Sequence, residues 1–97
     1  GLFDAVTLER WNVVNEVKPD AELDAYSRKL ATRLANGPTL AHAMTKRIVR
    51  AWRDEGMAGA DRVTRRDAAA LFESEDLKNA VDSFLENGPG RATYEGR

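Results

Sequence analysis

Apolar residues recur along most of the chain at steps of three and four positions, which is the spacing of one face of an α-helix. Asp4 can cap a short helix from Ala5 to about Trp11 by accepting a backbone N–H of its first turn. Asn12 follows where helices often stop in a left-handed conformation, which asparagine tolerates better than most residues. The pattern therefore predicts a short helix that stops at Asn12.

The next segment, from Val13 to Val17, is short, rich in β-branched residues and followed by Pro19. These properties predict a strand. A lone strand leaves backbone N–H and C=O groups unpaired, and no second strand is predicted in this chain. The prediction therefore implies a neighbouring strand outside the sequence.

Two longer helices are predicted next. Asp20 can cap the first of them, with Glu22 in its first turn at the positive end of the helix dipole. The residues 36–38, Asn-Gly-Pro, end this helix and begin the following one. The two apolar stripes are Leu23, Tyr26, Leu30 and Leu34 in the first, and Leu40, Ala41, Met44, Ile48 and Trp52 in the second.

Gly56 and Gly59 are expected to break the second stripe, and another helix is expected from about Ala60 to Phe72. Ser74 can cap a last helix, with two acidic residues in its first turn. Residues 87–89, Asn-Gly-Pro, would end it. The expected buried face of this last helix consists of Leu77, Ala80, Val81, Phe84 and Leu85.

These elements predict a mainly α fold: a small bundle of about four amphipathic helices with one short N-terminal helix and strand. Residues 1–18 would form a segment that belongs with a separate core, and residues 19–97 would form a helical domain. Helices with a single apolar face can bury one modest core, and apolar surface left over implies a partner.

The composition argues against several classes of function. The chain has 97 residues, 15 basic and 16 acidic residues, one histidine and no cysteine. A net charge of −1 does not support a nucleic-acid interface, and the lack of cysteine argues against a disulfide framework or a zinc site. No apolar run is long enough to span a membrane, and no signal peptide is evident, so we expect no membrane partner and a cytoplasmic location.

Four acidic residues are candidates for a catalytic pair, because general acid–base chemistry often uses two carboxyl groups. Glu16, Glu73, Glu75 and Asp76 do not lie on an apolar face with a nearby base, and two of them already begin a helix. We therefore predict no catalytic residue, no metal site and no cofactor within this chain.

Three segments together resemble the enoyl-CoA hydratase/isomerase, or crotonase, family. They are Phe3-Asp4-Ala5 through Trp11 to Val17, the helix from Pro19 to Pro38 with the following Ala43-Met44-Thr45-Lys46, and Ser74-Glu75-Asp76 through Phe84-Leu85-Glu86 with a tail that contains Tyr94. Each motif is short, but their order and spacing are specific. The resemblance is to the carboxy-terminal region of the family.

The resemblance implies an acyl-CoA thioester as the substrate of a parent enzyme that hydrates or isomerises 2-enoyl-CoA. In that family the catalytic groups belong to an amino-terminal core, which this chain is expected to lack, so the chain alone is expected to be inactive. The carboxy-terminal helical domain would assemble a homotrimer or hexamer with its own subunits and cover the acyl-CoA pocket. The chain is then interpreted as a piece of a longer protein that begins before Gly1.

Phe84 matches an aromatic residue that family members place near the adenine of CoA, although packing in the core is the more common role for such a position. Asn87 stands where many members have a lysine, and Gly88 where they often have an arginine, so positive charge is missing there. Phe84 and Asn87 are the candidate CoA contacts. The alternative function is a non-catalytic helical self-association module of crotonase ancestry, and the sequence leaves the acyl chain and the reaction open.

Overall fold

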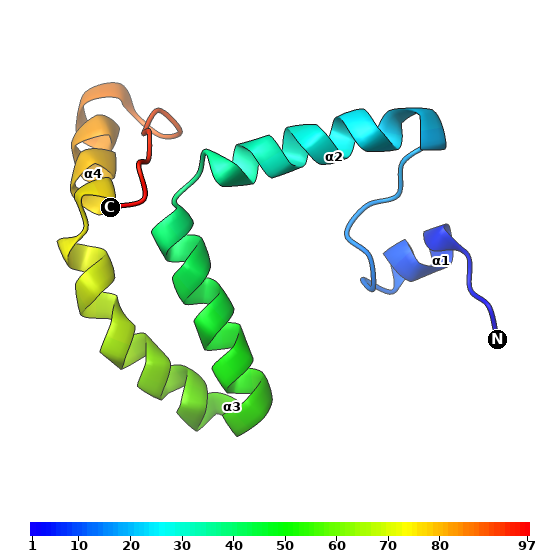
Figure 1. Cartoon of the computed structure of the whole chain (residues 1–97), viewed down its shortest axis with the longest axis horizontal. Coiled ribbons are helices and arrows are strands. Elements are labelled where there is room, and N and C mark those ends of the chain that lie inside the picture. Colours follow the sequence, from blue (N-terminus) through cyan, green and yellow to red (C-terminus); the bar gives the residue numbers. More distant parts are fainter. The chain divides into compact units, whose positions relative to one another are not determined.

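The computed structural model describes all residues from 1 to 97 and contains four helices and no strand (Figure 1). The helices are α1 (Ala5–Arg10), α2 (Asp20–Ala35), α3 (Thr39–Glu73) and α4 (Glu75–Asn87). The chain forms two compact units, Gly1–Thr32 and Arg33–Arg97. The last turn of α2 belongs to the second unit.

The start of α1 follows the predicted capping. The carboxylate of Asp4 accepts a hydrogen bond from the Thr7 backbone N–H at 2.7 Å, which also lowers the pKa of Asp4. The helix ends at Arg10, and Asn12 has a φ of 58°, which confirms the predicted left-handed stop. Local signals therefore determine both ends of this short helix.

The predicted strand from Val13 to Val17 is wrong. The backbone N–H groups of Val13 and Val14 donate to the Leu8 carbonyl at 2.9 and 3.4 Å, and that of Val17 donates to the Glu9 carboxylate at 2.8 Å. After Asn12 the chain folds back against α1. The hydrogen-bond acceptors for these backbone N–H groups therefore come from α1, and not from a neighbouring strand. The β-branched composition favours a strand only where a sheet surface is present to receive it.

Helix α2 starts differently from the prediction, because Asp20 is its first residue and does not cap it. The Pro19 carbonyl accepts from the backbone N–H groups of Glu22 and Leu23 at 2.9 and 3.1 Å. The Tyr26 hydroxyl donates to the Glu16 carboxylate, which also pairs with Lys18. These side-chain contacts attach the preceding loop to α2, while none of the helix is buried.

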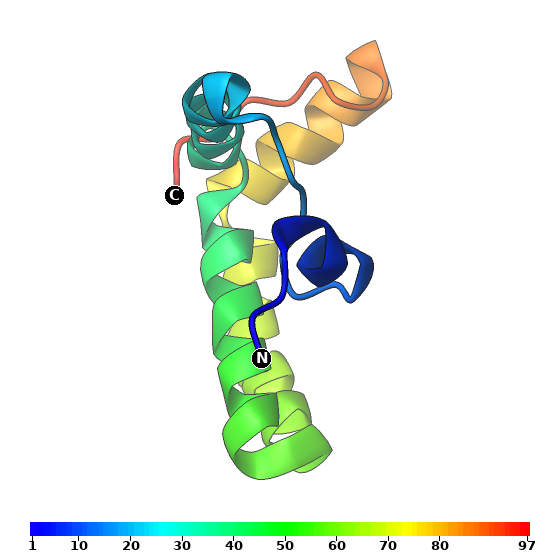
Figure 2. The ribbon, with the colours of Figure 1, turned by 90° about the vertical axis from the view of Figure 1, so that its right-hand side faces the viewer.

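Helix α3 consists of two helical arms, residues 39–55 and 57–73, that meet at Gly56 and fold back into a hairpin (Figures 1 and 2). Gly56 has φ 69° and ψ −159°, a backbone region that is essentially restricted to glycine. The predicted break at Gly56 is confirmed. Gly59, in contrast, lies inside the second arm and does not break it.

The hairpin core is small and made largely of small residues. The buried positions are Met44, Ala51, Gly59, Ala60 and Val63. A Cβ atom placed on Gly59 would lie 2.8 Å from the Ala51 carbonyl oxygen and 2.5 Å from the Glu55 Cβ. Gly59 is therefore required for the close approach of the arms just beyond the turn. Towards their other ends the arms flank an apolar cavity of about 110 Å³.

A charged bridge joins the arms beside this cavity. The Nε of Arg47 lies 2.7 Å from one Asp67 carboxylate oxygen, and the Nε of Arg66 lies 2.6 Å from the other. The Asp67 side chain is only 13% exposed. Arg66, and to a lesser extent Arg47, lowers the pKa of Asp67 from 3.8 to about 2. We call this group the Asp67 bridge.

Helix α4 begins as predicted. The Ser74 hydroxyl accepts from the Leu77 backbone N–H at 3.2 Å and donates to the Leu71 carbonyl at 2.7 Å, so one side chain ends α3 and begins α4. The expected buried face of α4 is only partly covered, since Val81, Phe84 and Leu85 are exposed. The expected division at residue 18 stays a prediction.

Replacing Gly59 by alanine tests the close approach. Alanine improves helix propensity by about 1 kcal/mol, but the inserted methyl meets a backbone oxygen that cannot easily move, and such overpacking costs about 1–3 kcal/mol. We expect Gly59→Ala to lower the free energy of unfolding, measured by urea titration. Ala58→Ser, at an exposed position in the same arm, is the control and should change stability little. A stabilised Gly59→Ala variant would contradict the packing described here.

Replacing Asp67 by asparagine tests the bridge. Because the folded-state pKa of Asp67 is lowered, its carboxylate stabilises the fold above about pH 4, and this contribution is lost as pH falls through about 2. The stability difference between wild type and Asp67→Asn should therefore be largest at neutral pH and disappear near pH 2. Asp54→Asn is the control, because Asp54 pairs with Arg53 of the same arm and does not connect the two arms. A pH-independent difference for Asp67→Asn would exclude the bridge.

Candidate functional site

The outer face of α4 carries an unpartnered apolar patch. Val81, Phe84 and Leu85 are 49%, 58% and 75% exposed, and their spacing of three and four residues places them on one side of the helix. We refer to these three residues as the α4 patch. Phe84 is thus not a core residue of this chain, and its ring is available to a ligand or to another protein.

Asn87, the second predicted contact, is the last residue of α4 and lies one turn beyond Phe84. It is exposed, and the Gly88 backbone N–H that follows it donates to the Phe84 carbonyl at 3.0 Å. The last turn contains no basic residue. Because the carboxy end of a helix carries partial negative charge, this end of α4 does not by itself attract phosphate groups.

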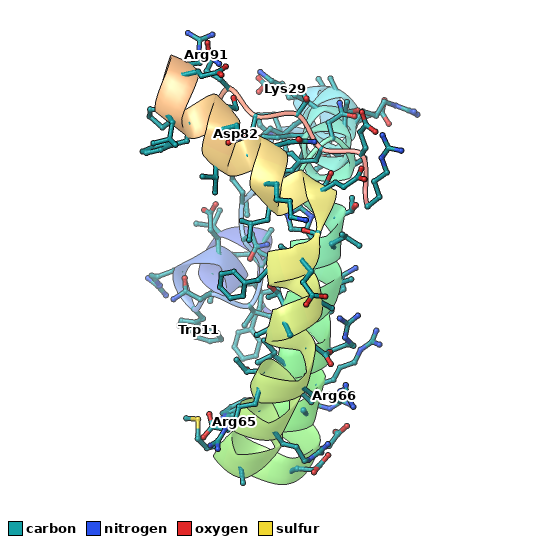
Figure 3. The ribbon with its side chains drawn as sticks, turned by 90° about the vertical axis from the view of Figure 1, so that its left-hand side faces the viewer. Trp11, Lys29, Arg65, Arg66, Asp82 and Arg91 are labelled. Carbon is teal, nitrogen blue, oxygen red and sulfur yellow. The ribbon has the colours of Figure 1, made fainter.

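Arg91 lies near the candidate CoA contacts and was not predicted from the sequence to do so. Gly88 and Gly90, with φ of 79° and 76°, reverse the chain after α4, and Figure 3 shows Arg91 at this outer end of the helix. A guanidinium there is the cation closest in sequence to the position where Asn87 lacks one. The two glycines around Pro89 were the signal that the chain turns back at this point.

A hollow of about 420 Å³ lies on the side of α4 near the end of α3. It is lined by Phe72, Leu77, Lys78, Val81 and Asp82. Lys78 is the only basic residue of α4. The hollow therefore combines apolar walls with one ammonium and one carboxylate group, a mixture suited to contact with a flat, partly polar group or with another helix.

Three of the four acidic residues weighed as catalysts, Glu16, Glu75 and Asp76, have structural partners. Glu75 lies 3.1 Å from the Arg97 guanidinium, and the Asp76 carboxylate accepts backbone N–H groups of the tail. Lys18, and then Tyr26, lowers the pKa of Glu16. A lowered pKa stabilises the ionised form, which makes Glu16 a poor general acid near neutral pH.

No three histidine, cysteine, aspartate or glutamate side chains are grouped so that they could hold a metal ion. None of the four helices combines the length and the apolar character required to cross a bilayer.

Comparison with known proteins gives the family. The model of the enoyl-CoA hydratase/isomerase family matches residues 1–96. The mitochondrial Delta(3,5)-Delta(2,4)-dienoyl-CoA isomerase of Dictyostelium discoideum is 39% identical to the chain over 86 residues. That match covers 87% of this chain and 29% of the relative, so the chain spans less than a third of the relative's length. No solved structure matches significantly.

The family match extends over nearly the whole chain and agrees with the resemblance noted in the sequence. The chain belongs to the enoyl-CoA hydratase/isomerase family.

Proposed function

We propose that the chain is the carboxy-terminal helical part of an enoyl-CoA hydratase/isomerase family enzyme. In this role it holds subunits together, as a homotrimer or hexamer, and covers the acyl-CoA pocket. The observation that carries the proposal is the imbalance between apolar residues that are buried and those that are exposed. Only Met44, Ala51, Ala60 and Val63 form the buried apolar core, and no large side chain is fully buried.

The exposed large apolar side chains are far more numerous than the buried ones. They occur in all four helices and in the segments before and after α1, and include Phe3, Trp11, Trp52, Phe72 and Phe84. Burying a large apolar side chain is worth about 1.5–3 kcal/mol, so a protein that left all of these in water would forgo most of its driving force for folding. Such a surface is typical of a segment that packs against other protein.

The family and the relative support a proposal for the reaction. The family acts on acyl-CoA substrates, and the relative's name describes a dienoyl-CoA isomerase. We therefore favour the shift of a double bond in an unsaturated acyl-CoA, with hydration of a 2-enoyl-CoA as the other family reaction. The oxyanion-binding amides and the acidic catalysts would come from outside residues 1–97, so the chain alone would be inactive.

A non-catalytic self-association module of the same ancestry is the second candidate. It shares with the first candidate the exposed apolar surface that favours association, and differs from it in having no catalytic core. Turnover of an unsaturated acyl-CoA by a longer protein that contains this chain distinguishes the enzyme from the module. The cytoplasmic location stays a prediction, and a mitochondrial location, given in the relative's name, is the alternative.

Self-association is expected to depend on the α4 patch. We expect the 97-residue chain to form a trimer or a larger oligomer at tens of micromolar in sedimentation equilibrium. Replacing both Phe84 and Leu85 by serine removes a large part of the exposed apolar area, and should weaken association at least about tenfold.

Glu86→Ser is the matched control, because Glu86 is exposed and lies on the side of α4 away from Phe84. It should leave association unchanged. A monomer at these concentrations, or equal weakening by the control and by the double variant, would contradict the proposed interface.

Phe84 and Asn87 are proposed to contact the adenine end of CoA. A charge-assisted hydrogen bond contributes about 1.5–3 kcal/mol, so Asn87→Lys in the full-length enzyme should lower the apparent dissociation constant for acyl-CoA about tenfold or more. Asn87→Gln, which adds length without charge, is the control. The increase in acyl-CoA affinity of Asn87→Lys should be largest at low ionic strength. An affinity that the lysine leaves unchanged at low salt would show that residue 87 does not face the nucleotide.

A further inference from the structure

Asp76 is the only charged residue buried in the structure, with 4% of its surface exposed. One oxygen of its carboxylate accepts the Glu95 backbone N–H at 2.7 Å, and the other accepts the Gly96 N–H at 2.9 Å. The backbone N–H of Asp76 donates in turn to the Arg97 carbonyl at 2.8 Å. Three successive residues of the tail are thus bound to one residue at the start of α4.

The tail, residues 91–97, also touches the first turn of α3. Gly96 has a φ of 78°, and a Cβ atom at this position would lie 3.2 Å from the Thr39 hydroxyl oxygen. Thr39 is the first residue of α3. Figure 1 shows the chain returning after α4, so that its carboxy terminus lies beside the start of that helix. The tail therefore connects the beginnings of α3 and α4.

Between these attachments the tail borders an apolar groove of about 250 Å³. The groove is lined by Pro38, Leu40, Ala41, Leu71, Ser74, Asp76, Leu77, Ala80 and Tyr94. Tyr94 is the residue that the tail contributes. Without the tail, the Asp76 carboxylate would lose two charge-assisted hydrogen bonds at the edge of this apolar surface, where an unpaired charge is unfavourable. Two charge-assisted hydrogen bonds thus link the bound tail to the buried carboxylate.

The direct connection between α3 and α4 is short. Ser74 alone separates the two helices, and its φ of −64° and ψ of 147° are not helical. A single residue with extended backbone can act as a hinge, because small changes in two dihedral angles rotate the whole following helix. A second attachment far along the chain from Ser74 would remove that freedom.

We propose that the tail is a strap that fixes the angle between α4 and the α3 hairpin, with Asp76 as its latch. When the tail is bound to Asp76, the strap holds the α4 patch in one orientation relative to the α3 hairpin. Released, it leaves α4 joined to α3 through Ser74 and through the apolar side chains that line the groove. The proposal concerns the conformation of this chain and does not depend on the reaction or the assembly proposed above.

Asp76→Asn is the main test. An amide has one accepting oxygen, and its NH₂ group would face an N–H donor of the tail, so both bonds cannot persist. Amide hydrogen exchange of Glu95 and Gly96 should become at least about tenfold faster. Because the chain contains no cysteine, Arg50→Cys and Glu86→Cys allow two nitroxide labels on exposed sites of α3 and α4. Their distance distribution, measured by double electron–electron resonance, should broaden in Asp76→Asn.

Two matched controls separate the latch from general effects of charge and of strain. Glu75→Gln removes only the exposed pair with Arg97 and should leave exchange and distance unchanged. Gly96→Ala weakens the strap without changing any residue of α4. The alanine would be strained at a positive φ and its Cβ would lie close to the Thr39 hydroxyl, so this variant should reproduce the effect of Asp76→Asn. Gly90→Ala introduces the same backbone strain at φ 76°, where no atom lies near, and should not.

The outcomes decide the proposal. Faster exchange together with a broadened distance in Gly96→Ala supports it, even if Asp76→Asn fails to fold. Unchanged protection of Glu95 and Gly96 in Asp76→Asn and Gly96→Ala overturns the latch. Faster exchange with an unchanged distance overturns the strap, because the angle of α4 would then be set by Ser74 and the groove alone.

Discussion

The contact between Ala51 and Gly59 is the constraint on which the second unit depends. Gly56 allows α3 to reverse direction, but the arms can lie against each other only because no side chain separates Gly59 from the Ala51 carbonyl. That approach brings Arg47 within reach of Asp67 and leaves the second arm ending at Ser74, where α4 begins. The turn thus determines where α4 begins, while the bonds between Asp76 and the tail act on its angle.

Local signals in the sequence predicted much of the helical architecture. Asp4, Asn12 and Ser74 act within a few residues of themselves, so their roles could be recognised without knowledge of tertiary contacts. The segment from Val13 to Val17 could not be predicted in this way. Its backbone conformation is determined by acceptors on α1, and intrinsic preference for a strand is weak when no sheet is present.

Two residues have roles that the sequence did not indicate, because one residue type has several uses. Glycine can end a helix or permit two helices to touch, and Gly59 does the second. An aspartate near a helix start can favour the helix dipole or bind a distant backbone, and Asp76 accepts two amides of the tail. For the candidate CoA contacts, helical periodicity placed Phe84 and Asn87 one turn apart, whereas Arg91 depended on a reversal at Gly88 and Gly90 that periodicity does not describe.

The hairpin also determines the order in which the second unit can assemble. The contacts nearest to Gly56 join residues that are close in sequence, so forming them closes only a short loop and loses little chain entropy. The Asp67 bridge spans 20 residues, as does the bond from Gly96 to Asp76, while the approach of Gly96 to Thr39 spans most of the unit. Helical structure with local contacts forms fastest in folding chains. The arms can therefore close progressively from the turn outwards, and the last residues of the chain find their places only after both α3 and α4 exist to receive them.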